Sequence, residues 1–85
     1  MKIFLHDKFK KKLNKLPLKI QEQFLFRLNI FMINPTDVIL NNHSVENCYP
    51  GSRSININGD YRAIFYIENN VAVFKKVGTH SELYG

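Results

Sequence analysis

The sequence predicts an α+β fold in which two N-terminal helices pack on a small antiparallel β-sheet. A length of 85 residues with 45% hydrophobic content allows one domain with one core. Apolar residues recur at helical spacing as far as about residue 33. From Arg53 onward the apolar spacing changes to two, which is typical of strands. We therefore treat residues 1–85 as a single domain.

Charge and cysteine content restrict the chemistry that this chain can carry. A net charge of +5 and a sequence pI of about 9.5 favour a polyanionic or acidic partner. Cys48 is the only cysteine, so no internal disulfide can form, and there is no paired Cys/His set for zinc. No apolar run is long enough to span a bilayer, and the N-terminus is charged too early for a signal peptide. We expect a cytoplasmic protein without metal, cofactor or membrane association.

The N-terminal region predicts a short strand over residues 1–5 and then a basic helix. Asp7 is the expected N-cap of that helix. Phe9, Leu13 and Leu16 recur at helical spacing. Lysines surround these apolar positions: Lys8, Lys10, Lys11, Lys12 and Lys15. The outer face of the helix is therefore basic, and it is either a solvated surface or a site for a polyanion.

A second helix is predicted from about Pro17 to Ile33. One apolar stripe contains Phe24, Leu25, Leu28, Phe31 and Met32, and three further residues widen it: Phe26, Ile30 and Ile33. The extra width favours a helix buried under the sheet, with a partner-binding surface as the alternative. Asn34-Pro35 ends the helix, because a residue before proline avoids the helical conformation.

Residues 36–52 are expected to form a polar loop that contains His43, and an antiparallel meander follows. Asn58-Gly59 predicts a two-residue type I′ turn, and Asn69-Asn70 a second two-residue turn. This register pairs Asn56 with Tyr61 and Ala63 with Lys76. The face toward the helices then holds Ile55, Ile57, Ile64, Tyr66, Val71, Val73 and Val77, with Arg53, Arg62 and Lys75 among them. The other face, suited to binding, holds Ser54, Asn56, Tyr61, Ala63, Phe65, Ile67, Phe74 and Lys76, although a one-residue slip would exchange the two.

The last eight residues, from Gly78 to Gly85, carry the most distinctive combination of side chains. His80 and Tyr84 stand four residues apart, and Lys76 precedes them. Histidine can gain or lose a proton near neutral pH, and a tyrosine ring can stack on a base. Lysine offers a charge for a phosphate. Taken alone, the segment is equally compatible with a disordered tail that carries a solvated histidine.

These motifs together resemble a RelE/ParE-superfamily toxin of a type II toxin–antitoxin module, in its YafQ-like branch. The resemblance covers nearly the whole chain. It rests on five segments: Phe9 with Leu13-Asn14-Lys15-Leu16-Pro17, Asn34-Pro35, His43 with Gly51 to Ile57, Asp60 to Tyr66, and Val77 to Tyr84. An aspartate and an aromatic that start a strand form a weak signal. A terminal Gly-Thr-His with an aromatic four residues later makes the combination fairly specific.

The resemblance implies a ribosome-dependent mRNA endonuclease that a cognate antitoxin inhibits. Carried over by position, it assigns catalytic roles to four residues: His80, His43, Asp60 and Tyr84. It assigns RNA or phosphate contacts to five more: Arg62, Lys76, Arg53, Tyr61 and Asn56. The lysines of the first helix, Lys8, Lys10, Lys11, Lys12 and Lys15, are expected to bind ribosomal RNA. The chain departs from the pattern at Asn56, where YafQ-like toxins can carry another histidine, and at Val45 and Asn47, where leucine and glycine are usual.

RNA cleavage of this kind needs no metal, because the 2′-OH can attack the adjacent phosphate. The enzyme must accept one proton, donate one to the leaving 5′-oxygen, and stabilise charge on the phosphorane. His80 is the expected acid, and His43 or Asp60 the base. Structural roles are also open: Asp60 could finish the turn, Arg62 could pair with Glu68 or Glu82, and Tyr61 could belong to the core.

Two other functions compete with RNA cleavage. The first is a ParE-like, non-enzymatic inhibitor of DNA gyrase, and the second is a basic module that only binds RNA or a protein partner. A pure binding protein has no use for a titrating histidine and a tyrosine beside lysines. The ending of the chain, with His80 and Tyr84, therefore favours the nuclease.

Overall fold

The computed structural model describes all of residues 1–85 and contains one five-stranded sheet with strand order β1-β5-β4-β3-β2. The strands are β1 (Lys2–Leu5), β2 (His43–Ser44), β3 (Arg53–Asn56), β4 (Tyr61–Glu68) and β5 (Val71–Thr79). The helices are α1 (Asp7–Lys15), α2 (Leu18–Ile33), the short 3-10 helix η1 (Val38–Leu40) and α3 (His80–Tyr84). All pairings are antiparallel except that of β1, which runs parallel to β5. The predicted α+β class is confirmed, with a mixed sheet.

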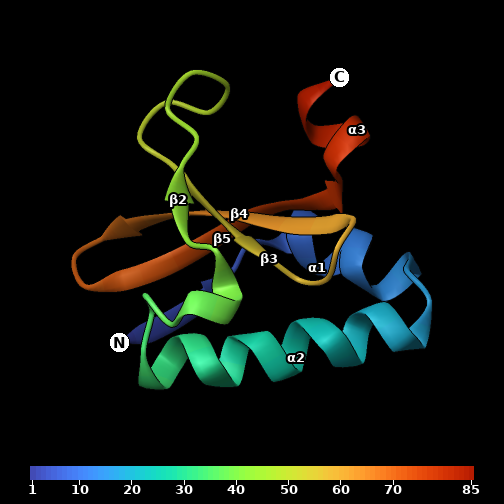
Figure 1. The fold of residues 1–85 in the computed structure, drawn as a ribbon, viewed down its shortest axis with the longest axis horizontal. Coiled ribbons are helices and arrows are strands. Elements are labelled where there is room, and N and C mark those ends of the chain that lie inside the picture. The colour runs from blue at the N-terminus through green and yellow to red at the C-terminus, as the bar shows by residue number, and fades with distance from the viewer.

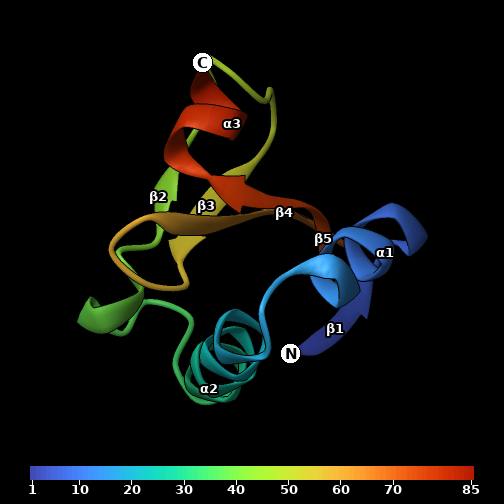
Figure 2. The same ribbon diagram turned by 90° about the vertical axis from the view of Figure 1, so that its right-hand side faces the viewer.

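Helices cover the two faces of this sheet unequally. Figures 1 and 2 show α2 below the sheet, whereas α3 and the segment between β2 and β3 stand above it. The core lies on the α1 and α2 side, where aromatic rings meet around Phe74. The Phe74 ring centroid lies 5.1 to 5.9 Å from those of Phe9, Phe24, Phe31 and Phe65. Tilted and edge-on aromatic pairs of this kind stabilise a core beyond the area they bury.

The start of α1 differs by one residue from the prediction. His6 is the N-cap, and its Nδ1 accepts a hydrogen bond from the backbone N–H of Lys8 at 3.3 Å. Asp7 is instead the first helical residue, where its negative charge interacts favourably with the positive end of the helix dipole. The helix ends at Lys15, and its C-cap residue, Leu16, is extended because Pro17 follows it.

The apolar stripe of α2 is narrower than predicted. Phe24, Leu28 and Phe31 are buried against the sheet. Leu25 and Met32, predicted within the stripe, face solvent with 53% and 43% of their surface exposed. Of the three residues predicted to widen the stripe, Phe26 and Ile33 are exposed, whereas Ile30 packs against the core. The helix therefore covers the sheet with one side and leaves apolar side chains on the other.

The segment predicted as a loop over residues 36–52 contains two short elements. The helix η1 buries Leu40 in the core, and β2 pairs His43 with Ser54 and Ser44 with Arg53. Pairing with β3 places His43 on the edge strand of the sheet rather than in a solvated loop.

One of the two predicted turns is correct. Asn69 and Asn70 have φ angles of 50° and 66°, as a type I′ turn requires. The Asn58-Gly59 prediction is wrong, because neither residue has a positive φ and residues 57–60 together connect β3 to β4. The Asn58 side-chain oxygen accepts hydrogen bonds from the backbone N–H groups of Asp60 and Tyr61, at 2.8 and 2.7 Å. This side-chain contact is what shapes the longer turn.

The longer turn and a bulge in β5 shift the register from the predicted one. Asn56 pairs with Arg62 instead of Tyr61. In the β4–β5 pair, an irregularity between Ile64 and Phe65 leaves Lys75 unpaired, so Ala63 pairs with Val77 instead of Lys76.

The predicted sheet faces are therefore wrong for β4 and for most of β5. The core face holds Ile55, Ile57, Ala63, Phe65, Ala72, Phe74 and Val77. Because side chains alternate along a strand, Arg62, Ile64 and Tyr66 point to the α3 side. Ser54 and Lys76 pair with Ile64 and share that side, as predicted for both.

Candidate active site

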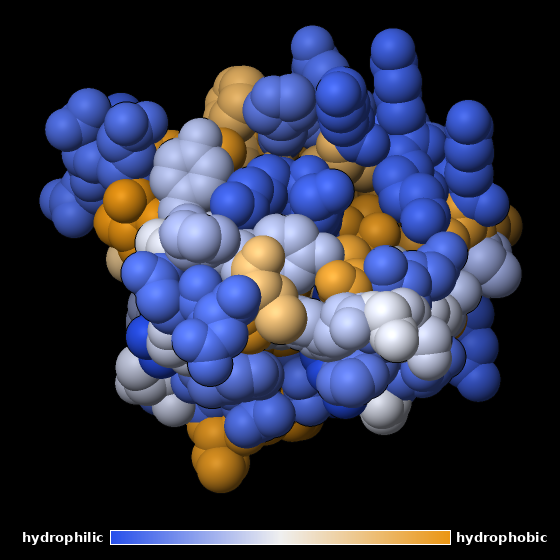
Figure 3. Space-filling view, turned by 90° about the horizontal axis from the view of Figure 1, so that it is seen from above, coloured by the Kyte–Doolittle hydropathy of each residue, from blue (hydrophilic) through white to orange (hydrophobic).

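A cavity of about 470 Å³ opens on the α3 side of the sheet. Ten residues line it: Asn41, His43, Ser44, Val45, Glu46, Asn47, Cys48, Arg62, His80 and Tyr84. Four predicted site residues are among them, from three separate elements: His43 of β2, Arg62 of β4, and His80 and Tyr84 of α3. Figure 3 shows this side of the molecule, which is mostly hydrophilic with smaller hydrophobic patches.

His80 is the first residue of α3, directly after β5. Its backbone N–H donates a hydrogen bond to the carbonyl oxygen of Asp60 at 3.0 Å, which ties α3 to the turn before β4. Its ring lies 4.8 Å from the Tyr84 ring, centroid to centroid, because residues four apart share one face of a helix. The His80 side chain is exposed and can reach a ligand in the cavity.

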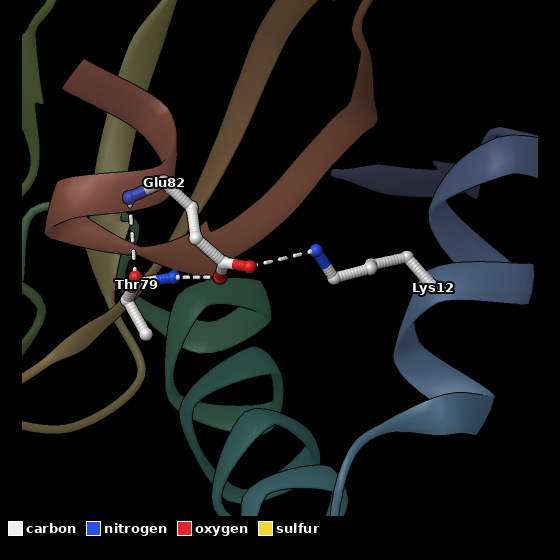
Figure 4. A network of polar contacts seen from close by, with 3 residues as sticks. All are labelled: Lys12, Thr79 and Glu82. Carbon is white, nitrogen blue, oxygen red and sulfur yellow. Dashed lines mark hydrogen bonds and ion pairs between the residues drawn. The ribbon is translucent and has the colours of Figure 1, made fainter. Parts of the chain in front are cut away.

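A capping box and an ion pair fix the start of α3 (Figure 4). The Thr79 hydroxyl accepts from the Glu82 backbone N–H at 3.2 Å, and the Thr79 N–H donates to the Glu82 carboxylate at 2.8 Å. The Lys12 ammonium lies 3.4 Å from that carboxylate. These contacts, led by the Thr79 backbone N–H, lower the pKa of Glu82. A Cβ at Gly78 would lie 2.9 Å from the Glu82 carboxylate, so glycine gives the network its space.

The His43 ring is oriented by a backbone contact. Its Nδ1 lies 2.7 Å from the carbonyl oxygen of Asn41, a residue in the left-handed conformation with φ of 48°. A carbonyl oxygen can only accept, so Nδ1 carries the proton in this contact. In a neutral ring, Nε2 is then left as the acceptor. That tautomer suits a general base.

Arg62 lines the cavity without an acidic partner. Its guanidinium donates to three carbonyl oxygens of the β3–β4 turn, those of Asn58, Tyr61 and Gly59, at 2.9 to 3.2 Å. Pairing with Glu68 or Glu82 does not occur, because Lys12–Glu82 is the one ion pair of the molecule. The charge of Arg62 is therefore positioned by neutral groups and remains available to an anion.

The remaining catalytic candidate, Asp60, lies outside the cavity wall. Its carboxylate is exposed, whereas its backbone oxygen holds His80 and its N–H closes the turn on Asn58. Tyr61 is half-buried and packs against the core, on the opposite side of the sheet from Arg62.

Three further RNA-binding candidates lie outside the cavity. Arg53 is exposed and donates from Nε to Asn42 at 2.7 Å, in a separate depression. Asn56 is half-buried, and its side-chain oxygen is buried with no hydrogen-bond partner. Lys76 lines a groove of about 280 Å³ shared with Lys75, Lys8 and Lys12.

The lysines of α1 remain at the surface. Lys8, Lys10, Lys11 and Lys15 are exposed, and Lys12 is partly covered by its contact with Glu82. The groove therefore joins part of the basic helix to the end of β5, on the other side of α3 from the cavity.

Sequence reasoning missed Tyr49, which contacts α3 through both its hydroxyl and its ring. The available signal was an aromatic residue in a polar segment, directly before Pro50-Gly51. It also missed the cavity wall formed by residues 44–48, because nothing in their pattern predicts where that segment folds.

The fold is shared with a class of solved structures, the RelE-superfamily toxins. No family model matches the chain, and no curated protein matches its sequence. YafQ from E. coli strain BL21(DE3) superposes with a TM-score of 0.81 at 17% identity, over 98% of this chain and 97% of YafQ.

Two further toxins show the same fold. A YoeB/ParE toxin from Agrobacterium tumefaciens has a TM-score of 0.76 at 10% identity, over 94% of this chain and 99% of that one. The RelB–RelE antitoxin–toxin complex from Methanococcus jannaschii matches with a TM-score of 0.71 at 17% identity, over 95% of this chain and 94% of the matched chain. The chain thus has the YafQ-like fold of RelE-superfamily toxins, and the resemblance found in its motifs is confirmed at the level of the fold.

No group of three or more His, Cys, Asp and Glu side chains is arranged to hold a metal ion. None of the helices has the length and apolar character needed to cross a membrane.

Proposed function

We propose that this chain is the toxin of a type II toxin–antitoxin module and acts in the cytoplasm as a ribosome-dependent mRNA endoribonuclease. The observation that carries the proposal is the cavity in which His43, Arg62, His80 and Tyr84 meet. These residues come from separate parts of the chain, yet they supply a base, a phosphate-binding cation, an acid and a stacking ring. The fold shared with YafQ and RelE supports the same function.

Each side chain has a definite role in the proposed cleavage. His43 accepts the 2′-OH proton at Nε2, while its Nδ1 is held by the Asn41 carbonyl. The 2′-oxygen forms a bond to phosphorus, and the bond from phosphorus to the 5′-oxygen breaks. Protonated His80 donates its proton to that leaving oxygen, and Arg62 stabilises the charge on the phosphorane. The Tyr84 ring stacks on a splayed base.

Other predicted residues contribute outside the cavity. Lys76 and the lysines of α1 contact phosphates of the message or of ribosomal RNA. Asp60 holds His80 through its backbone oxygen, so we assign it a positioning role in place of the base. A cognate antitoxin, the acidic partner that the charge of +5 favours, is expected by analogy with the RelB–RelE complex.

The decisive experiment is induced expression followed by mapping of mRNA 5′ ends. We expect cuts within translated frames and growth arrest. The His80→Ala variant should lose growth arrest and cleave about 10²–10⁴-fold more slowly, because that is the usual contribution of general acid catalysis. Its melting temperature and ribosome binding should stay close to wild type, since the His80 side chain is exposed. Growth arrest with intact mRNA and inhibited DNA gyrase would support the ParE-like alternative.

A further inference from the structure

The C-terminal helix that carries His80 and Tyr84 is too short to hold its own position. It has five residues and no buried side chain. Isolated helices of this length are unstable in water, so contacts with the rest of the chain must set its position. At its start, α3 is held by the Thr79–Glu82 capping box, by Lys12 and by the Asp60 carbonyl.

Tyr49 holds the other end of α3. Its hydroxyl donates a hydrogen bond of 2.6 Å to the carbonyl oxygen of Leu83, in the last turn of the helix. Its ring meets the Tyr84 ring edge-on, with centroids 6.1 Å apart and an angle of 68°. No other side chain forms a hydrogen bond with Leu83, Tyr84 or Gly85. The Tyr84 ring in turn contacts His80.

Tyr49 is itself fixed within its loop. Its N–H donates to the Val45 carbonyl at 2.8 Å, and its carbonyl accepts from the Ser52 N–H at 3.0 Å. The ammonium groups of Lys75 and Lys76 lie 5.8 and 5.9 Å from the ring centroid, within the range of cation–π attraction. Burial, with a smaller effect of Tyr84, raises the pKa of Tyr49, so its hydroxyl remains a donor at neutral pH.

From this geometry we infer that Tyr49 is a positioning residue, which orients His80 and Tyr84 toward the cavity without touching the RNA itself. The expected effect of Tyr49 on cleavage rests on the proposed nuclease function. Its expected effect on the position of α3 does not. The inference also assigns a role to the loop between β2 and β3. Residues 45–48 of this loop line the cavity, and Tyr49, which follows them, holds α3 in place.

Tyr49→Phe is the direct test, because it removes the hydrogen bond to Leu83 and keeps the ring. Tyr66→Phe is the matched control: Tyr66 is also half-buried on the α3 side, its ring lies 5.5 Å from the Lys75 ammonium, and its hydroxyl forms no hydrogen bond. We expect Tyr49→Phe to slow single-turnover cleavage on programmed ribosomes about three- to tenfold, the range that one net hydrogen bond corresponds to. Tyr66→Phe should cleave like wild type. Ribosome affinity should be unchanged in both.

The second readout is NMR of the free protein. In wild type we expect nuclear Overhauser contacts between the His80 and Tyr84 rings; these should weaken in Tyr49→Phe and persist in Tyr66→Phe. Tyr49→Leu, which also removes the ring, should lose the contacts and slow cleavage about 10²-fold, as misplaced catalytic groups do. If Tyr49→Leu fails to fold, Tyr49→Phe alone decides.

Two results would overturn the inference: ring contacts in Tyr49→Phe that match those of Tyr66→Phe, or weakened contacts with undiminished cleavage. A wild-type protein that cuts no RNA would instead contradict the proposed function. The NMR comparison would then still decide whether Tyr49 places α3.

Discussion

At the scale of single residues, Arg62 is the side chain whose environment most clearly favours an anion. It lines the cavity with His43 and His80, and no carboxylate neutralises it. Three carbonyl oxygens fix the guanidinium in place. Its orientation is therefore prepared before any phosphate arrives, which is what efficient charge stabilisation requires.

We predict that Arg62→Ala lowers single-turnover cleavage about 10- to 100-fold, because a hydrogen bond to a charged group contributes about 1.5–3 kcal/mol. The variant should also destabilise the turn before β4, since three carbonyl oxygens lose their donor. Arg53→Ala is the control, because Arg53 lies outside the cavity and already bonds Asn42. Equal losses in the two variants would show that charge alone, rather than position, matters.

Four of the residues that the sequence proposed for the site line one cavity, whereas Tyr61 packs against the core. The types and order of these four residues match the pattern of YafQ-like toxins, which is how the sequence led to them: His43, Arg62, His80 and Tyr84. Tyr61 and Arg62 were both expected at the RNA, yet neighbouring residues of a strand point to opposite faces. Only one of the two can line the cavity, and burial of Tyr61 against the core decided which.

At the scale of elements, the position of α3 depends on an exposed carboxylate. Glu82 closes the capping box and pairs with Lys12. Its pKa is lowered by these contacts, so they stabilise the fold when the carboxylate is ionised. The stabilisation is complete above the ordinary pKa of 4.5 and is lost as the pH falls through the lower pKa of the folded state.

We therefore predict that Glu82→Gln melts at a lower temperature than wild type at pH 7. The difference should shrink steadily below pH 4.5 and disappear once Glu82 is protonated in both states. Thermal melts at a series of pH values measure this directly. Glu22→Gln, at an exposed glutamate without a bonding partner, should show no such convergence. A constant difference across the acid range would mean that the carboxylate charge plays no part.

The lysines of α1 form the second element with a testable role. Lys10 and Lys11 are exposed and unpaired, whereas Lys12 is engaged with Glu82 and would confuse the test. We predict that Lys10→Glu with Lys11→Glu weakens ribosome binding strongly and reduces its salt dependence, because each lost phosphate contact lowers the slope by about 0.7–0.9. Filter binding at several salt concentrations measures both effects. Lys2→Glu with Lys19→Glu changes the net charge equally and should have much less effect.

The two asparagine turns show why register could not be read from the sequence. Asn69 and Asn70 adopt the positive φ angles that a two-residue turn needs. Asn58 instead uses its side chain to bond the backbone of Asp60 and Tyr61, which lengthens the turn. Asparagine is suited to both conformations, and a one-residue difference exchanges the faces of the strand that follows. No local sequence pattern is strong enough to predict the length of this turn or the bulge at Lys75, and so the register cannot be predicted either.

At the scale of the whole molecule, two kinds of surface are left uncovered. One is basic, formed by α1 and the end of β5. The other is apolar, on the outer side of α2 and the residues after it: Leu18, Leu25, Phe26, Met32, Ile33, Val38 and Ile39 are all exposed. A protein with the cavity as its only purpose has no need of exposed apolar side chains in such number. Exposed apolar surface of this kind is typical of a protein–protein interaction site.

Under the proposed function, the partner that covers these surfaces is the antitoxin. An acidic segment that folds on binding would suit both the charge of +5 and the exposed apolar residues of α2. We predict a complex whose pI lies well below 9.5 and whose melting temperature is markedly higher than that of the free chain, because binding to the folded state alone stabilises it. Isoelectric focusing and thermal melts of the purified complex provide the measurements.

The contribution of the apolar surface can be separated from that of the charge. Phe26 has 60% of its surface exposed, so the uncharged variant Phe26→Ser should fold normally, cleave RNA like wild type and bind the antitoxin at least tenfold more weakly. The tenfold loss corresponds to about 1.4 kcal/mol, which is modest for a buried aromatic contact. Ile67→Ser, at an exposed apolar residue of β4, is the control and should leave binding unchanged. A partner that is itself basic, or full affinity in Phe26→Ser, would show that the antitoxin recognises another part of the molecule.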